Sequence, residues 1–349
     1  MGLGGIGRFV LRGLPVALAI IVLAVAFLFL LNDIQGKSSQ GKLRVLSYSG
    51  FVNSWGAGPE IAKRFLDETG IEIEFHDGGD AGLLLKKLEL FPADLVIGFD
   101  QATVAEAAEA KLWRVLSERY LANMVEEVRP VAARWLEEGF VAFDWAPMAF
   151  VYRQGEIEPP QSLQDLLDER FRGAIALQDP RTSTPGLQFL LWVLAELGVD
   201  EGFQFLERLK PNIHSVSAGW SAAYGLFSKK QAKLVFSYLT SPLYHQLEEN
   251  DSSYKAAVFG NKHPIQVEFV VIPDNCVECV RAEMFVEFLL EPEIQNLIMR
   301  KNFMLPVING GVEGEFAHLP AIGVMNFEKQ AELMKQKDEL LTRWQNLGL

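Results

Sequence analysis

The sequence predicts an α/β protein with two lobes, preceded by one N-terminal transmembrane helix. Three observations lead to this expectation. Residues 14–31 form an uncharged apolar run. Segments with strand-like and helix-like hydrophobic periodicity then alternate along the chain. The order of these segments indicates that the chain leaves a first α/β unit, builds a second and returns to the first. A length of 349 residues is sufficient for two such units, although length alone also allows one large domain.

Composition narrows the possible functions. Hydrophobic residues make up 49% of the chain and charged residues 22%, as in an ordinary globular protein, so most of the chain should fold. The formal net charge of -13 argues against a nucleic-acid partner, because phosphate backbones are bound by basic surfaces. An acidic surface is compatible with a cationic ligand, although most acidic proteins are acidic only for solubility.

The first segment, residues 1–31, is interpreted as a cytoplasmic stub with a membrane anchor or signal. Arg8 and Arg12 precede the apolar run, which exceeds the ~7–15 residues of a cleaved secretory signal and lacks an A-x-A-like site. As a helix, the run is long enough to cross roughly 30 Å of hydrocarbon. We therefore favour an uncleaved anchor over a cleaved signal, and the two arginines place the rest of the chain outside the cytoplasm.

The remaining chain is divided into a linker and two lobes. Residues 32–41 form the linker, 42–145 the first part of lobe 1, 146–258 lobe 2, and 259–349 the return to lobe 1 with C-terminal helices, the last expected over 327–347. The order strand, helix, strand, helix, strand after the linker predicts a parallel sheet with right-handed crossovers. Ligands bind beyond the carboxyl ends of such strands, so residues 48–55, residues 77–82 and Asp100 are the first places to look for a site.

Cys276 and Cys279 are the two cysteines of the chain and form a C-x-x-C pair. Outside the cytoplasm such a pair can oxidise to a small-loop disulfide, and a lone C-x-x-C can also be redox-active. We favour the structural disulfide, because the pair begins an amphipathic helix. No second Cys or Cys/His pair completes a zinc site, which needs about four ligands.

The segment DPRTSTPGLQFLLW contains a candidate ligand-binding helix end. Thr184 is a good N-cap and Pro185 suits the first helical position. Ser183 and Thr184 would then lie where free backbone N–H groups and the positive helix end attract an anion or a hydroxyl. An ordinary helix cap is the alternative. Residues 179–181 end a predicted strand, which puts this cap at the rim of a cleft.

Aromatic residues gather between residues 219 and 245. Trp220 and Tyr224 are spaced i, i+4 and share a helix face, for which packing in the core is the default interpretation. Tyr238 and Tyr244 flank Leu-Thr-Ser-Pro-Leu after a predicted strand, where an aromatic side chain tends to face a cleft. Aromatic faces attract flat or cationic ligands, at roughly 0.5 to 2 kcal/mol per contact. A few polar groups among such rings are typical of a small-molecule pocket.

Motifs of common enzymes are missing from the sequence. It contains no G-x-S-x-G elbow, no Walker loop, no H-E-x-x-H motif and no Asp-rich calcium loop. Five histidines are scattered without metal-ligand spacing. We therefore expect a non-catalytic binding protein with no catalytic residues and no metal site.

Five stretches carry a resemblance to a known family. They are WGAGPE (55–60), QDPRTSTPGL (178–187), GWSAAYGLF (219–227), SYLTSPLYH (237–245) and NFMLPV (302–307). Through them, the chain from about residue 42 to its end resembles bacterial periplasmic thiamine-binding proteins, the substrate-binding components of thiamine ABC importers. The resemblance implies a type II periplasmic-binding fold that closes on thiamine, thiamine monophosphate or thiamine diphosphate, with no cofactor. It also implies a periplasmic monomer that delivers its ligand to an ABC permease in the inner membrane.

The resemblance also implies a set of ligand contacts. Carried over position by position, they fall on Asp80, Ala81, Ser183, Thr184, Trp220, Tyr238, Leu239, Thr240, Ser241 and Tyr244, with Tyr48, Trp55 and Phe303 as further candidates. Aromatic side chains would stack on the cationic thiazolium and the flat aminopyrimidine of thiamine. The carboxylate of Asp80 would supply charge or a hydrogen bond, and the helix cap would hold the hydroxyethyl or phosphate arm.

Two departures from the family pattern leave alternatives open. Ser49 stands where family members commonly have an aspartate, and Trp145 and Pro147 replace a more tyrosine-rich pattern. A cation with one carboxylate fewer would bind more weakly, or the ligand is another thiamine derivative. The alternatives are a thiamine-degrading enzyme of the same fold with a cysteine nucleophile, or a binding protein for a polyamine or a ferric ion. No Cys lies at the strand ends of the first lobe, and tryptophan beside the two tyrosines favours an organic cation over iron.

Overall fold

The computed structural model describes residues 41–79, 81–110, 112–260 and 262–349. The apolar run over residues 14–31 lies outside this part of the chain. No helix within the described ranges is long and apolar enough to cross a membrane. Leu43–Leu349 forms one compact unit, which is the unit analysed below.

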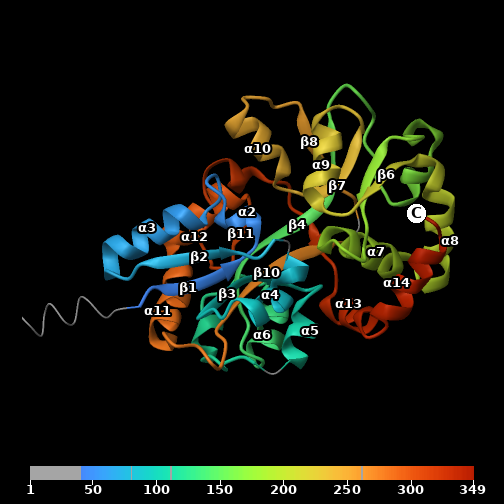
Figure 1. The fold of residues 1–349 in the computed structure, drawn as a ribbon. Coiled ribbons are helices and arrows are strands. Elements are labelled where there is room, and N and C mark those ends of the chain that lie inside the picture. Colours follow the sequence, from blue (N-terminus) through green and yellow to red (C-terminus); the bar gives the residue numbers. More distant parts are fainter. Residues whose placement is uncertain (1–40, 80, 111, 261) are drawn as a thin grey trace, which may run out of the picture. The chain divides into compact units, whose positions relative to one another are not determined.

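Strands and helices alternate through most of this unit (Figure 1). The strands are β1 (Leu43–Ser47), β2 (Ile73–Asp77), β3 (Leu95–Asp100), β4 (Val141–Arg153), β5 (Ile175–Gln178), β6 (Ile213–Ser217), β7 (Leu234–Tyr238), β8 (Tyr254–Ala257), β9 (Lys262–His263), β10 (Ile265–Val271), β11 (Leu305–Pro306) and β12 (Gly323–Val324). The α-helices are α2 (Ser49–Val52), α3 (Gly58–Thr69), α4 (Leu84–Leu90), α5 (Val104–Glu109), α6 (Arg129–Leu136), α7 (Thr184–Leu197), α8 (Val199–Leu209), α9 (Trp220–Ser228), α10 (Ser241–Glu248), α11 (Cys279–Leu289), α12 (Pro292–Asn302), α13 (Phe327–Met334) and α14 (Lys337–Asn346).

The main sheet of the described chain is 10-stranded, with the order β2-β1-β3-β10-β4-β7-β5-β6, and β8 and β11 also pair with β4. Strands β2, β1 and β3 are parallel, as the strand–helix alternation after the linker predicts. Helix α3 ends at Gly70, whose φ of 72° is the left-handed conformation that glycine adopts readily. The hydrophobic periodicity therefore predicted the start of the fold correctly.

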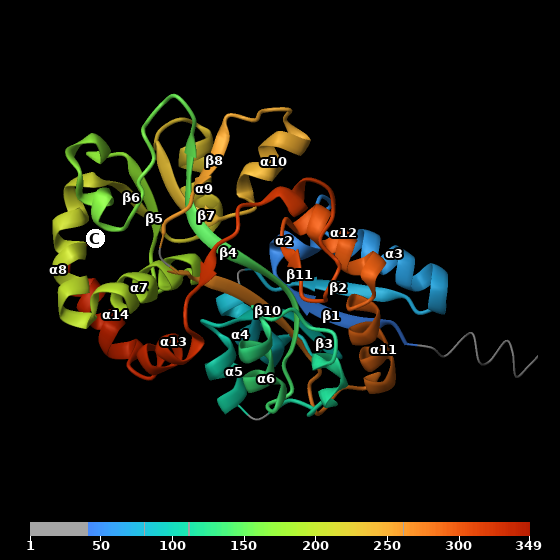
Figure 2. The same cartoon turned by 180° about the vertical axis from the view of Figure 1, so that it is seen from behind.

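Strand β4 joins the two lobes. Its first half pairs antiparallel with β10, from Val141 to Pro147, and its second half pairs with β7, from Met148 to Tyr152. We call the elements around β1, β2, β3 and β10 lobe 1, and the elements around β5 to β8 lobe 2. β4 runs from one group of strands to the other (Figures 1 and 2). The sequence analysis placed the start of a second unit in this segment and did not foresee one strand shared by both lobes.

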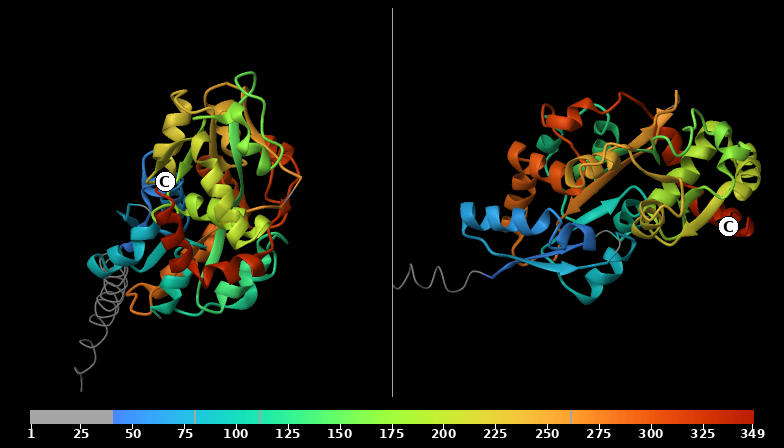
Figure 3. Two further views of the ribbon diagram at one scale, coloured as in Figure 1. Left: turned by 90° about the vertical axis from the view of Figure 1, so that its right-hand side faces the viewer. Right: turned by 90° about the horizontal axis from the view of Figure 1, so that it is seen from above.

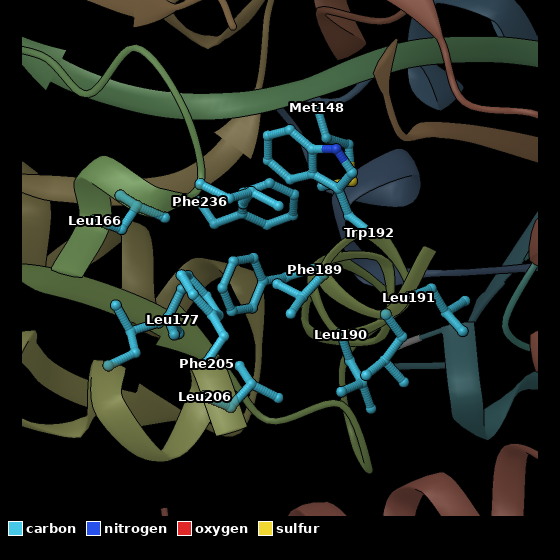
Figure 4. Close-up of a cluster of buried hydrophobic side chains, with 14 of the residues drawn as sticks. Met148, Leu166, Leu177, Phe189, Leu190, Leu191, Trp192, Phe205, Leu206 and Phe236 are labelled. Atoms are coloured by element: carbon cyan, nitrogen blue, oxygen red, sulfur yellow. The ribbon is translucent and has the colours of Figure 1, made fainter. Parts of the chain in front are cut away.

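Lobe 2 is built around α7, a helix that is apolar on every side. All of its residues from Pro185 to Ala195 are buried, which is the pattern of a helix enclosed by other elements. Figure 4 shows Phe189 and Trp192 of this helix packed against Phe236 of β7, with Met148 of β4 beside them. The core of lobe 2 therefore reaches the strand that connects it to lobe 1.

The C-terminal segment forms two helices in place of the single helix expected over 327–347. It breaks after Met334, and the next helix begins at Lys337. Leu340 and Trp344 of α14 are buried in the same hydrophobic cluster as α7. Both views of Figure 3 show these red helices beside the yellow-green helices of lobe 2. The break at residues 335–336 allows α13 and α14 each to turn an apolar side toward lobe 2.

Cys276 and Cys279 form a disulfide, as the sequence analysis expected. The loop that it closes is fixed to lobe 1 by Asp94, which lies just before β3. Asp94 accepts hydrogen bonds from the backbone N–H groups of Val277 and Glu278 and pairs with the Arg44 guanidinium of β1. The start of β1 and the start of α11 are therefore tied to one buried carboxylate.

Replacing Trp344 with alanine should destabilise the protein by about 3–5 kcal/mol, because a fully buried indole leaves a large cavity. Trp55→Ala is the matched control, since the Trp55 side chain is 64% exposed and its loss should change stability by less than about 0.5 kcal/mol. Chemical denaturation of both variants checks this. Equal midpoints for the two variants would show that the C-terminal helices contribute little to the core of lobe 2.

Candidate functional site

Trp220 and Tyr224 form an aromatic stack at the start of α9. Their ring centroids are 4.9 Å apart, so the i, i+4 spacing does place both rings on one helix face. The Trp220 ring also lies 6.1 Å from the ring of Tyr238. The indole N–H of Trp220 donates to the Ser237 hydroxyl, 2.8 Å away, which fixes the ring orientation. Trp220 is only partly buried, so part of its ring remains available to a ligand.

Tyr238 ends β7 at the junction of the lobes. It lies opposite Met148 of β4, the first residue of that strand to pair with lobe 2. Its hydroxyl donates to the Oε1 atom of Gln266 on β10, 3.0 Å away. The side chain therefore extends from a strand of lobe 2 to a strand of lobe 1.

Three acidic residues lie side by side across the neighbouring strands. The antiparallel register of β10 places Glu268 opposite Asp100 of β3 on one side and opposite Asp144 of β4 on the other. Residues directly opposite in antiparallel strands project their side chains to the same face of the sheet. All three side chains are buried. We call Asp100, Glu268 and Asp144 the acidic row.

Asp100 is the member of the acidic row with the most hydrogen-bond donors. Its Oδ1 atom accepts from the backbone N–H groups of Ala102 and Thr103 and from the Thr103 hydroxyl. Its Oδ2 atom accepts from the hydroxyl of Thr184, the first residue of α7. The Asp100–Thr184 bond joins the carboxyl end of β3 in lobe 1 to the N-terminus of a lobe 2 helix.

The other two carboxyl groups of the acidic row each keep one oxygen without a partner. Glu268 accepts through Oε1 from the Gln266 amide, and Asp144 accepts through Oδ2 from the Asn302 amide. Glu268 Oε2 and Asp144 Oδ1 are buried and have no hydrogen-bond partner of ordinary geometry, although the Tyr48 hydroxyl lies close enough to Glu268 to lower its pKa. Two buried acceptor atoms at the junction of the lobes therefore lack a partner of ordinary hydrogen-bond geometry among the described residues.

Tyr48 approaches the same place from lobe 1. Its hydroxyl accepts a hydrogen bond from the Asn302 amide that also binds Asp144. Its ring lies against the backbone of Gly98 on β3, where a Cβ would come within 2.2 Å of the Tyr48 ring. Gly98 also has a φ of 108°, which disfavours any other residue. The glycine is required for Tyr48 to lie beside the acidic row.

Burial dominates the electrostatics of the acidic row. It raises the pKa of the Glu268 carboxyl to about 7, against the Tyr48 hydroxyl, which lowers it, and with a further contribution from the charge of Asp100. Burial, followed by the charge of Glu268, raises the pKa of Asp144 well above its ordinary value. Burial also raises the pKa of Asp100, against the hydrogen bonds that stabilise its charge. The phenols of Tyr48 and Tyr238 have raised pKa values for the same reason, first burial and then the nearby carboxylates.

The predicted helix cap is shifted by one residue. Ser183 is the N-cap and Thr184 is the first helical residue, so Pro185 occupies the second helical position. The Ser183 side chain makes no capping hydrogen bond, and the Thr184 hydroxyl is directed to Asp100. Thr184 therefore lies beside the acidic row, and Ser183 precedes it in the chain.

The remaining candidates from SYLTSPLYH lie in three different places. Ser241 joins the Trp220 side, because its hydroxyl is 2.8 Å from the Ser237 hydroxyl, and Thr240 is buried next to it in the chain. Leu239 instead lines a separate pocket of about 300 Å3 between β8, α10 and the segment around Leu319. Tyr244 is 42% exposed and packs its ring 5.5 Å from that of Phe303.

Two of the candidates belong to the segments of lobe 1 that follow β1 and β2. Trp55 is exposed and lies near Gly50, on the side where the Tyr48 ring also lies. Ala81 begins a short 3-10 helix and is partly buried. Asp80 lies outside the described residues. The structure therefore brings together Thr184, Trp220 and Tyr238 with Tyr48, and leaves the role of Asp80 as a prediction.

Sequence reasoning missed most of the polar groups at this junction. Asp100 was singled out only as a strand end, and Asp144, Glu268 and Gln266 were not considered. The available signal was a lone acid inside each of two apolar strand segments, FVAFDWAPMAF and IQVEFVV. A polar residue in a buried strand needs a partner or a function.

The two departures from the family pattern have structural counterparts. Ser49 donates its hydroxyl to Asp77, 2.6 Å away, so the serine binds an existing carboxylate at the end of β2. Trp145 is buried and donates its indole N–H to the Pro306 carbonyl, which makes it part of the core. In the described parts of the chain, no group of three or more His, Cys, Asp or Glu side chains is arranged to hold a metal ion.

Comparison with known sequences identifies relatives over most of the chain. The sequence profile described as bacterial extracellular solute-binding protein matches residues 92–324. The thiamine-binding periplasmic proteins of Salmonella typhimurium and Escherichia coli are each 34% identical to this chain, over 87% of it and 92% of their own length. That of Haemophilus influenzae is 34% identical over 80% of this chain and 83% of its own length.

Comparison with solved structures also identifies periplasmic binding proteins as similar to this chain. A periplasmic thiamin binding protein superposes with a TM-score of 0.80 at 34% sequence identity, covering 89% of this chain and 97% of its own. A ferric binding protein from Campylobacter jejuni superposes with a TM-score of 0.72 at 20% identity, covering 88% and 99%. At 20% identity, the similarity to the ferric binding protein shows only that the two proteins share a fold.

Gly98→Ala should destabilise the protein by about 2–4 kcal/mol, because the new methyl group meets the Tyr48 ring and the backbone strain adds to that contact. Gly70→Ala is the matched control, since Gly70 also has a positive φ but open space around it, and should cost only about 1 kcal/mol. Thermal unfolding of both variants provides the comparison. Equal losses would mean that strain alone, without the Tyr48 contact, explains the glycine.

Proposed function

This chain belongs to the family of bacterial extracellular solute-binding proteins, and from that premise we propose that it captures thiamine and delivers it to an ABC permease. The observation that carries the proposal is the position of partly exposed aromatic rings beside buried carboxylates that no cation of the described chain neutralises. A ligand that is both flat and positively charged matches this combination. Thiamine meets both requirements, and relatives of this chain carry its name.

Each part of the site would meet one part of the ligand. Trp220 and Tyr238 would stack on its rings, and the positive charge of the thiazolium would lie near Glu268 and Asp144. Ser183 and Thr184, at the N-terminus of α7, would hold the hydroxyethyl arm or a phosphate ester. Asp80, Ala81, Tyr244, Trp55 and Phe303 remain proposed contacts of the same ligand.

Delivery would depend on closure of the lobes. β4 and β10 connect the lobes, and the Asp100–Thr184 and Tyr238–Gln266 bonds already join the lobes in this structure. A ligand held between the lobes favours the closed state in proportion to its additional contacts there. The closed surface would then be recognised by the permease, with the protein acting as a periplasmic monomer anchored to the inner membrane through residues 14–31.

The proposal assigns no catalytic step to the protein. Both cysteines are joined in a disulfide near the start of α11, so neither is placed as the nucleophile of a thiamine-degrading enzyme. Neither a cofactor nor a nucleic-acid partner is part of the proposed function.

Trp220→Ala should weaken thiamine binding by at least ten-fold, about 1.4 kcal/mol, because the largest aromatic face at the site is lost. Trp220→Phe retains a ring without the bond to Ser237 and should bind with intermediate affinity. Isothermal titration calorimetry of the full-length protein measures both.

Trp135→Ala serves as the control for this series. Trp135 packs against Phe140 and the Arg134 guanidinium in lobe 1, and its loss should leave thiamine affinity unchanged. An unchanged affinity in Trp220→Ala would contradict the proposed pocket. No measurable binding of thiamine to the unmodified protein would contradict the proposed function itself.

A further inference from the structure

The acidic row contains more buried acid than the described chain can neutralise. Asp100 and Asp144 both lie directly opposite Glu268, and like charges in directly opposite positions of a sheet destabilise it. No lysine or arginine makes an ion pair or hydrogen bond with any of the three in the described part of the chain. Asp100 is stabilised by four donor groups, whereas Glu268 and Asp144 each keep one bare buried oxygen.

The groups around the Glu268 and Asp144 carboxyl groups come from several elements, and none of those named below carries a positive charge. Tyr48 follows β1, Asp100 ends β3, Tyr238 ends β7, Gln266 lies on β10 and Asn302 ends α12. The titratable members are acids or phenols, which add negative charge or none. An ionised Glu268–Asp144 pair is therefore unfavourable until a cation arrives from outside the chain.

We propose that Glu268 and Asp144 form a proton-exchange site: the ligand-free protein holds a proton on this pair, and a bound organic cation displaces it to solvent. The exchange balances, because one carboxyl O–H bond breaks, its proton passes to the buffer, and the carboxylate left behind faces one positive ligand charge. The identity of the cation as thiamine rests on the proposed function. The presence of a proton on the Glu268–Asp144 pair in the ligand-free protein does not depend on that function.

Burial and charge support this assignment. The Glu268 pKa is raised to about 7 by burial and then by the charge of Asp100, so the carboxyl is largely protonated in mildly acidic solution. A positive charge within about 4–6 Å would lower that pKa again and release the proton. Ligand affinity should therefore increase as the pH rises toward 7 and become constant above it.

The ligand-free protein provides the first test. Glu268 has a folded pKa above its ordinary value of 4.5, so the folded state binds the additional proton between about pH 4.5 and 7 and loses stability as the pH rises through this window. Glu268→Gln cannot lose a proton. As the pH rises across this range, the ratio of folded to unfolded protein in this variant, divided by the same ratio in the unmodified protein, should increase by up to about ten-fold per pH unit.

Two further variants complete the stability comparison. Asp144→Asn tests the other carboxyl group and should give a change of the same sign. Glu126→Gln replaces an exposed acid of lobe 1 and should follow the unmodified protein at every pH. If Glu268→Gln and Asp144→Asn also follow the unmodified protein, no proton is stored on the pair and the inference is overturned.

The second test measures proton release on binding. Calorimetric titration of full-length protein with thiamine at pH 6, in two buffers of different ionisation enthalpy, should show release of close to one proton per ligand. Release should fall toward zero at pH 8.5 and should be reduced at pH 6 in Glu268→Gln. Thiamine binding without proton release at pH 6 would overturn the exchange and leave the proposed function intact. Failure of thiamine to bind would overturn the proposed function, and the stability comparison would then decide by itself whether a proton is stored.

Discussion

The register of β10 between β3 and β4 is the constraint on which the site depends. It places Glu268 opposite Asp100 and Asp144 at once, and a slip by one residue would turn all β10 side chains to the other face of the sheet. β4 then continues into lobe 2, where its partner β7 ends at Tyr238. One continuous sheet therefore brings acids from lobe 1 and aromatic rings from lobe 2 to the same junction.

A row of buried acids is costly for stability, and the surrounding structure offsets only part of that cost. Thr103, Thr184 and two backbone N–H groups stabilise the charge of Asp100, while the amides of Gln266 and Asn302 each satisfy one oxygen of the other two acids. Groups left in this condition are more often found at functional sites than elsewhere, because a ligand can complete their interactions. A cationic ligand that completes the interactions of these acids would add stabilising free energy that the ligand-free protein lacks, and this free energy would contribute to binding.

Sequence patterns predicted the elements better than their meeting points. Periodicity located the strands and helices of the first lobe, and the resemblance identified the family and the α/β periplasmic-binding-protein fold. The role of the aromatic residues around Trp220 stays a prediction. The acidic row was missed because its members lie at positions 100, 144 and 268, and only the strand register makes them neighbours. The contact between Tyr48 and Gly98 was missed for the same reason, because the two residues are neighbours only in the folded sheet. The break in the C-terminal helix was missed as well, because local periodicity does not reveal that both helices pack into the hydrophobic cluster around α7.

The proposed function requires that a flat cation binds at the junction where aromatic rings of lobe 2 meet the acidic row. A crystal structure of the protein with thiamine bound tests it most directly. We expect the thiazolium within about 6 Å of the carboxyl groups of Glu268 or Asp144, with a ring face of the ligand against Trp220 or Tyr238. Thiamine bound elsewhere, for example in the pocket beside Leu239 and Leu319, with the acidic row unchanged and remote from the ligand, would contradict it.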